Sequence, residues 1–224
     1  MTIRALLQEN FQLSKAKGIE AREEAVKLAR RSLLFNVGPR YPADIIYGDF
    51  RDVVTSDTTL RDYDLVTGTP PYFRVDFSVQ GGDTVTSAIV REGGMPTARQ
   101  SAPARCEFRG GIEAYALAAS QVVAPDTGRF VVCENYLNHQ RVLEAANLAK
   151  LQVLHVAKVR GREGKEPLFG IYTMRKPTNC KRETVAQSPA FQEEAFAVRD
   201  KDGNWTPRYL TVFQTLSIPP LGSQ

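Results

Sequence analysis

A run of five residues, Thr69-Pro70-Pro71-Tyr72-Phe73, combines a hydroxyl, two prolines and two aromatic rings directly after an apolar stretch. Proline fixes its own φ and pushes the preceding residue toward extended backbone, so two prolines in a row form a stiff, open segment. Such a segment would hold Tyr72 at the end of a strand, with carbonyl oxygens lining a flat slot. Ligands of open α/β sheets bind at the carboxyl ends of strands, which makes this a candidate site. The alternative is a simple turn after a strand.

The run resembles the Asn-Pro-Pro-Tyr signature of S-adenosylmethionine-dependent amino-group methyltransferases, with Thr69 where that family usually has Asn. The resemblance implies catalytic roles for Thr69, Pro70, Pro71 and Tyr72. The Thr69 hydroxyl and the Pro70 carbonyl would accept the hydrogens of the target amino group, and Tyr72 would stack on the target base, a contact worth about 1–3 kcal/mol. Methyl transfer from a sulfonium is a direct displacement that needs alignment and no metal. Thr69 in place of Asn weakens the case for adenine as the target.

The elements that must position this slot alternate between strand and helix. We predict strands over 15–20, 45–50 and 64–67, and a helix over 23–36 that ends at Gly38-Pro39. This alternation predicts an α/β fold: a Rossmann-like, doubly wound, mostly parallel sheet covered by helices.

The remaining chain extends the same pattern. An apolar stripe predicts a helix over 107–123, followed by a buried strand over 129–134 and a helix capped by Asn138 that runs to about Lys150. Strands over 151–159 and 168–174 flank a polar connector, which predicts a C-terminal antiparallel pair. We therefore expect residues 1–176 to form the domain, and residues 177–224 to form a linker, a small hairpin over 196–199 and 209–216, and a tail.

This order of elements resembles the class I methyltransferase fold and, within it, the small-domain tRNA adenine-N6 methyltransferases. The match runs from about Lys15 to Lys176 and includes Gly18-Ile19-Glu20, Gly48-Asp49-Phe50 and Ala102-Pro103-Ala104-Arg105-Cys106-Glu107. The resemblance implies that Glu20 accepts hydrogen bonds from the cofactor ribose, that Asp49 accepts from the cofactor adenine, and that Phe50 lies against its ring. Glu20 as a helix N-terminal acid and Asp49 as a turn residue are the structural alternatives.

The resemblance also implies an RNA substrate in the cytoplasm, contacted by Phe73, Arg99 and Arg105. An adenine must leave its stack to reach such a pocket. A phosphate-facing surface is one interpretation of the basic residues, and a solvated face with interspersed acids is the other. These residues are Arg74, Arg91, Arg99, Arg105, Arg109, Lys158, Arg160, Arg162, Lys165, Arg175, Lys176, Lys181 and Arg182.

One feature of the family is missing. The first strand and the Gly-rich turn that cradles the cofactor do not occur before the helix expected over 3–11, so the predicted domain is N-terminally incomplete. Three explanations remain: a start site placed too late, a fragment completed by another chain, or a relative that no longer binds cofactor. We favour the first, and the activity of the 224-residue chain stays open.

Composition sets broad limits on function. A net charge of +4 over 224 residues is mildly basic and compatible with RNA. The three cysteines and two histidines lack metal-site spacing, so we expect no metal, and sparse thiols fit a reducing compartment. No apolar run is long enough to span a membrane and no signal peptide is seen, which predicts a cytoplasmic protein without a membrane partner.

Two further functions remain open. Release-factor methyltransferases, which modify a protein glutamine amide, share the Asn-Pro-Pro-Tyr signature, although they usually carry a separate N-terminal helical domain. The third possibility is a non-catalytic RNA-binding or interaction module derived from a methyltransferase. The sequence does not predict the oligomeric state.

Overall fold

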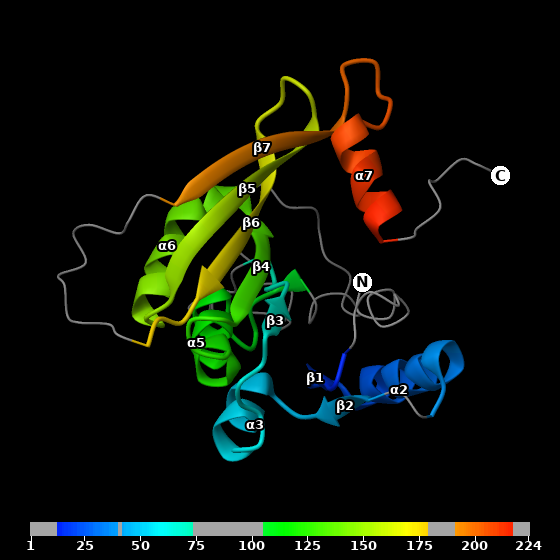
Figure 1. Ribbon diagram of the computed structural model, residues 1–224, viewed down its shortest axis with the longest axis vertical. Coiled ribbons are helices and arrows are strands. Elements are labelled where there is room, and N and C mark those ends of the chain that lie inside the picture. Colours follow the sequence, from blue (N-terminus) through cyan, green and yellow to red (C-terminus); the bar gives the residue numbers. More distant parts are fainter. Residues whose placement is uncertain (1–12, 40–41, 74–104, 179–190, 217–224) are drawn as a thin grey trace, which may run out of the picture. The chain divides into compact units, whose positions relative to one another are not determined.

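The computed structural model describes residues 13–39, 42–73, 105–178 and 191–216. The chain forms two compact units. The first comprises Met1–Asp57, Arg162–Gly164 and Ala197–Gln224, and the second comprises Thr58–Gly161 and Lys165–Phe196. The helix expected over 3–11 and most of the linker expected over 177–189 fall outside the described residues. Figure 1 labels the elements of both units.

The first unit begins with two parallel strands and a helix. Strand β1 (Ala16–Glu20) pairs with β2 (Ala43–Tyr47), and α2 (Glu23–Val37) connects them. Two glutamates in the first turn of α2 suit the positive end of its dipole, and Val26 is its buried residue. A side chain at Gly18 would lie 2.8 Å from Ile45 Cδ1, so glycine permits the close pairing of the strands. Strand β1 and α2 confirm the sequence-based prediction, and β2 confirms the first part of the strand expected over 45–50.

A short helix that the sequence did not predict follows β2. The strand expected over 45–50 ends at Tyr47, and α3 (Phe50–Ser56) starts where the strand was expected to continue. The reason is local: Gly48 has a φ of 150°, and the Asp49 side chain accepts a hydrogen bond from the Arg51 amide at 3.1 Å as the helix N-cap. Asp49 therefore begins a helix instead of closing a strand.

The second unit is built on a five-stranded sheet. Its strands are β3 (Leu65–Gly68), β4 (Arg129–Asn135), β5 (Gln152–Arg162), β6 (Pro167–Arg175) and β7 (Gln192–Arg199), in the order β3-β4-β6-β5-β7 (Figure 1). Strands β3 and β4 are parallel, and β6 runs antiparallel to both β4 and β5. The predicted antiparallel pair is confirmed.

Helices α5 (Ile112–Val122) and α6 (His139–Leu148) pack on one face of this sheet. Burial alternates along β4, where Phe130, Val132 and Glu134 are buried and their neighbours are not. The core combines these strand residues with the apolar stripe of α5 and the inward face of α6. Asn138 precedes α6 as predicted, but its side chain does not cap the helix; its amide donates to Glu134 Oε1 at 3.1 Å.

Helix α5 starts later than predicted. Residues 107–111 form a turn, because Gly110 takes a φ of 92° that ends any helical run through it. The helix then begins after Gly111. Glu107, which we expected on the helix, is thus available for a contact described below.

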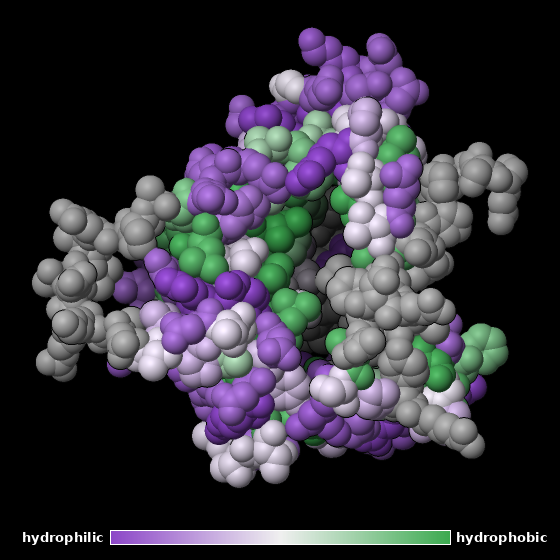
Figure 2. All heavy atoms as spheres, viewed as in Figure 1, coloured by the Kyte–Doolittle hydropathy of each residue, from purple (hydrophilic) through white to green (hydrophobic). Residues whose placement is uncertain are grey.

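The C-terminal hairpin prediction is wrong in its second half. Residues Pro207–Thr215 form helix α7, because the Thr206 hydroxyl accepts from the Tyr209 amide and proline occupies the first turn. The turn over 200–204 joins β7 to it, and in Figure 2 it forms part of the hydrophilic surface at the top of the view. None of the helices in the described ranges has both the length and the apolar character required to cross a bilayer.

Candidate active site

The slot residues follow β3 in the second unit. After Gly68, Pro70 is buried, Thr69 is exposed, and Pro71 and Tyr72 are half-buried. Gly68 pairs with Val132 of the parallel strand β4, so the slot lies beside the carboxyl end of β4. The register thus places the slot at the carboxyl edge of the β3–β4 pair, the edge at which open α/β sheets generally bind ligands.

Tyr72 lies against the ends of two strands. Its ring centroid is 5.6 Å from that of Phe169 in β6, with the planes tilted by 44°, and its hydroxyl is 3.9 Å from Cys133 Sγ of β4. Burial, followed by the charges of Cys133 and Glu134, raises the pKa of the Tyr72 phenol above its usual range. Tyr72 is thus an uncharged ring at neutral pH, suited to stacking and not to taking up a proton.

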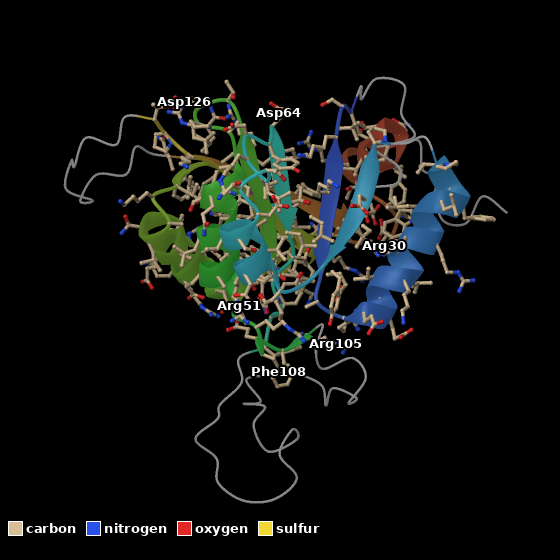
Figure 3. The ribbon with its side chains drawn as sticks, turned by 90° about the horizontal axis from the view of Figure 1, so that it is seen from below. Arg30, Arg51, Asp64, Arg105, Phe108 and Asp126 are labelled. Atoms are coloured by element: carbon tan, nitrogen blue, oxygen red, sulfur yellow. The ribbon has the colours of Figure 1, made fainter. Side chains whose placement is uncertain are left out.

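A short backbone bridge fixes the residue after Tyr72. The Phe73 amide donates to the Arg105 carbonyl at 3.0 Å, and the Glu107 amide donates to the Phe73 carbonyl at 2.9 Å. The bridge brings Arg105, Cys106 and Glu107, the end of the Ala102–Glu107 stretch, beside the slot. Arg105 is exposed, and Figure 3 shows it at the opposite end of this unit from Asp64 and Asp126, which precede β3 and β4. Arg99 lies outside the described residues.

A cluster of charged side chains holds the Arg105–Glu107 segment against helices α5 and α6. Arg141 of α6 donates to both carboxylate oxygens of Glu107, at 2.6 and 2.8 Å, and to both oxygens of Glu113, at 2.6 and 2.7 Å. The side chains of Arg141 and Glu107 are only 15% and 10% exposed. The hydrogen bonds that Arg141 donates to Glu107 raise the pKa of the guanidinium above its usual range. Gly111 leaves room for the cluster, because a side chain there would lie 2.5 Å from Arg141 Nη2.

Glu134, at the carboxyl end of β4, is a buried acid with 1% of its surface exposed. Its Oε1 accepts from the Asn135 amide at 2.8 Å and from Asn138 Nδ2 at 3.1 Å. Burial raises the pKa of this carboxyl to about 7, the nearby Glu107 charge adds to the rise, and the two hydrogen bonds and Arg141 oppose it. Glu134 is therefore close to half-ionised at neutral pH.

The raised pKa of Glu134 predicts a pH-dependent stability. The folded state favours the protonated acid, so this contribution is complete below about pH 4.5 and is lost as the pH rises through about 7. Glu134→Gln keeps the Oε1 acceptor and removes the charge. We expect the variant to gain about 3 kcal/mol of unfolding free energy over the wild type between about pH 4.5 and 7.5, by the conversion of pKa shifts to energy. Urea unfolding at both pH values measures the difference, and a constant difference would contradict it.

The proposed cofactor residues lie in the first unit, at or just after the ends of two adjacent parallel strands. Glu20 pairs with Tyr47, and the Gly48 amide donates to the Glu20 carbonyl at 3.1 Å. The Oε1 of Glu20 accepts from the Arg22 amide and Nε, while its Oε2 has no hydrogen bond within the described ranges. Asp49 makes more hydrogen bonds than Glu20. The Arg51 side chain donates to both Asp49 oxygens at 2.8 Å, in addition to the helix-capping bond. Phe50 is the first residue of α3.

Two of the basic residues contact neighbouring side chains. Lys158 donates to Glu193 at 2.6 Å, and Arg175 Nε donates to Gln152 at 2.8 Å. Lys181, Arg182, Arg74 and Arg91 fall outside the described ranges. Within the residues that are placed, no three His, Cys, Asp or Glu side chains converge as metal ligands would.

Sequence reasoning missed four residues of this site: Cys133, Phe169, Glu134 and Arg141. One signal was present, since Glu134 ends an apolar strand run with a carboxylate on the buried face. Cys133 and Phe169 reach Tyr72 only through the pairing of β3, β4 and β6. No local pattern marks such contacts.

No family model matches the sequence, and no curated protein does. Solved structures do resemble the fold. A predicted O-methyltransferase, protein Atu636 from Agrobacterium tumefaciens, matches with a TM-score of 0.58 at 12% identity, over 97% of this chain and 96% of that one.

Two other structures give lower scores. A type I restriction-modification methyltransferase subunit from Streptococcus thermophilus has a TM-score of 0.49 at 11% identity, and a putative class I S-adenosylmethionine-dependent methyltransferase from Listeria monocytogenes has 0.46 at 12% identity. The matches cover 97% and 90% of this chain but only 51% and 54% of theirs. The fold assignment rests on the first match and confirms the predicted α/β class: the chain shares a Rossmann-like fold with that protein.

Proposed function

We propose that this protein is an S-adenosylmethionine-dependent methyltransferase that methylates an exocyclic amino nitrogen, with adenine N6 in RNA as its foremost substrate. One observation carries the proposal. Within a methyltransferase fold, the Thr69–Tyr72 slot follows β3 at the carboxyl edge of the sheet, with Tyr72 supported by Phe169 and Cys133.

The chemistry follows from the slot. An adenine amino group is a weak nucleophile because its lone pair is delocalised into the ring. Two acceptors, the Thr69 hydroxyl and the Pro70 carbonyl, hold its hydrogens and favour a pyramidal nitrogen that attacks the methyl carbon. Tyr72 holds the base by stacking, and Phe73 and the exposed Arg105 contact the neighbouring part of the substrate. Arg99 is proposed to do the same from the segment between them.

The cofactor contacts are proposed for the first unit. Glu20 offers Oε2 to the ribose hydroxyls, since Arg22 occupies only Oε1. Asp49 and Phe50 are proposed to contact the cofactor adenine, and Asp49 must do so while capping α3 and pairing with Arg51.

The first test is calorimetric titration of the chain with S-adenosylhomocysteine, the product of the cofactor. We expect micromolar affinity, and Glu20→Ala is expected to weaken it about tenfold or more, equivalent to about 1.4 kcal/mol for lost hydrogen bonds to a charged acceptor. Glu24→Ala is the matched control, because Glu24 is an exposed acid in the first turn of α2 whose ion pair with Lys27 lies at the surface.

Two results would count against this assignment. Absence of binding by a chain that circular dichroism shows to be folded contradicts the proposed cofactor. An unchanged dissociation constant for Glu20→Ala removes Glu20 from the site. Transfer to DNA, or to the glutamine amide of a peptide, in place of RNA would keep the chemistry and change the substrate.

A further inference from the structure

Phe108 is a half-buried aromatic residue in the turn that leads into α5. The apolar residues on either side of it, Cys106 and Ile112, are only 1% and 0% exposed, whereas Phe108 does not belong to the core cluster. Figure 3 shows its ring at the same end of the second unit as Arg105, beyond the ends of the strands. A single exposed aromatic ring is ordinary on a protein surface, so the way in which it is held decides whether it can serve a ligand.

Backbone hydrogen bonds fix the turn that carries Phe108. The Phe108 amide donates to the Cys106 carbonyl at 2.8 Å, and the Gly110 amide donates to the Glu107 carbonyl at 3.2 Å. Gly110 completes the turn with a φ of 92°, a conformation that residues with a side chain rarely adopt. The backbone is therefore held on both sides of the ring.

The side chain that precedes Phe108 ties the turn to two helices. Both carboxylate oxygens of Glu107 accept from Arg141 of α6, at 2.6 and 2.8 Å, and Arg141 also donates to both oxygens of Glu113 in α5. A side chain at Gly111 would lie 2.6 Å from Glu107 Cδ, so glycine leaves room for these contacts. Paired hydrogen bonds between a guanidinium and a carboxylate fix orientation as well as distance. A ring on such a turn is ordered before a ligand arrives, which lowers the entropy lost on binding.

This turn begins beside the slot. Phe73, which follows Tyr72, forms a short parallel bridge with the start of the turn: the Phe73 amide donates to the Arg105 carbonyl, and the Phe73 carbonyl accepts from the Glu107 amide. Phe108 follows directly after this bridge, and Arg105, which is exposed, lies within it. One short segment thus holds a cation and an aromatic ring next to the chain that leaves the slot.

We propose that Phe108 stacks on the nucleotide next to the target base in a single-stranded RNA, an inference that rests on the proposed function. When Tyr72 holds the target base in the slot, the flanking base has lost its stacking neighbour. A preordered aromatic ring beside the slot supplies a replacement. The exposed guanidinium of Arg105 contacts the phosphate between the two nucleotides by a charge-assisted hydrogen bond. Phe108 is thus a substrate-binding residue that favours a single strand over a duplex.

The test measures the affinity for a fluorescent single-stranded RNA that has one adenosine in a run of uridines, by anisotropy with S-adenosylhomocysteine present. Phe108→Ala is expected to weaken binding about tenfold, within the range of about 5- to 150-fold for one stacked base. Phe108→Trp keeps a stacking ring and should bind as the wild type does. Phe108→Leu keeps apolar bulk without a ring and should resemble Phe108→Ala. Phe35→Ala is the matched control, because Phe35 is 89% exposed near the end of α2 that is remote from Glu20.

A second RNA separates stacking from a structural role. It carries abasic nucleotides on both sides of the adenosine, so the base that Phe108 is proposed to contact is missing. We expect the wild type and Phe108→Ala to bind this RNA with equal affinity, since the protein ring and the flanking base form one interacting pair. Calorimetric titration with S-adenosylhomocysteine and urea unfolding show whether each variant keeps its fold.

The outcomes separate the two claims. The stacking role is overturned, and the proposed function stands, when Phe108→Ala binds the first RNA within about twofold of the wild type or when Phe108→Leu binds it equally well. A difference between the wild type and Phe108→Ala that persists on the abasic RNA overturns it too, as does a loss of fold or of cofactor-product affinity in Phe108→Ala. A folded wild-type chain that binds RNA through Phe108 but transfers no methyl group to it overturns the proposed function and leaves the contact.

Discussion

Tyr72→Ala is expected to reduce methyl transfer by about 100-fold or more while leaving the affinity for S-adenosylhomocysteine within about threefold. Stacking of a base on an aromatic ring contributes about 1–3 kcal/mol, which is about 5- to 150-fold in binding. Loss of the ring also releases the base from alignment with the methyl group. Tyr72 contacts Phe169 and Cys133 in the second unit, whereas the proposed cofactor contacts of Glu20 lie in the first.

Tyr72→Phe is the matched control for this prediction. It keeps the ring that packs on Phe169 and removes only the hydroxyl, whose contact with Cys133 is a long 3.9 Å. We expect its rate to stay within about threefold of the wild type. An unchanged rate for Tyr72→Ala, measured by transfer of a labelled methyl group, would remove the stacking role.

Arg141→Met is expected to lower the free energy of unfolding by about 3 kcal/mol, at the lower end of the range for removing one partner from a buried ion pair. Arg141 is 15% exposed and holds Glu107, which is 10% exposed. Without the guanidinium, Glu107 is left charged in a poorly solvated position beside the buried Glu134. The backbone bridge to Phe73 also loses its anchor on α6. Urea unfolding at neutral pH measures the loss.

A second variant shows whether the uncompensated charge is the cause. Arg141→Met combined with Glu107→Gln removes the orphaned carboxylate, so we expect the double variant to be more stable than Arg141→Met alone. Glu113→Gln should lower the free energy of unfolding less than Arg141→Met or the double variant does. The reason is that Glu113 is 37% exposed, so water can solvate the remaining groups. A double variant no more stable than Arg141→Met would contradict this explanation.

Periodicity predicted the elements whose packing face is regular. The apolar residues along one side of α5 and the alternate, buried residues of β4 both pack in the core. Burial of those faces stabilises the helix and the strand, which is why the pattern predicted them. The same reasoning failed where a single polar side chain decides the local structure. Asp49 caps α3 where a strand was expected to continue, and Thr206 with Pro207 starts α7 in a β-branched, aromatic run that resembled a strand.

The candidate site likewise contains one part that a local sequence pattern predicts and another part that it does not. The run Thr69–Tyr72 was evident because proline stiffens its own neighbours, whatever the rest of the fold does. The residues that support it come from far along the chain: Cys133 is 61 positions from Tyr72, and Arg141 is 34 from Glu107. Those contacts depend on strand order and on helix packing, which local patterns do not specify.

Methyl transfer to the amino group of a base in RNA is the central claim, and nucleoside analysis tests it most directly. The chain is incubated with S-adenosylmethionine carrying a labelled methyl group and an unmodified RNA, which is then digested to nucleosides. The nucleosides are separated by chromatography against standards of each methylated adenosine, because these isomers have the same mass. We expect the label on the exocyclic nitrogen of adenosine in the wild-type reaction, and its loss with Tyr72→Ala but not with Tyr72→Phe. Label on a ribose oxygen or on a ring carbon, or label that persists with Tyr72→Ala, would contradict the role assigned to Thr69, Pro70 and Tyr72.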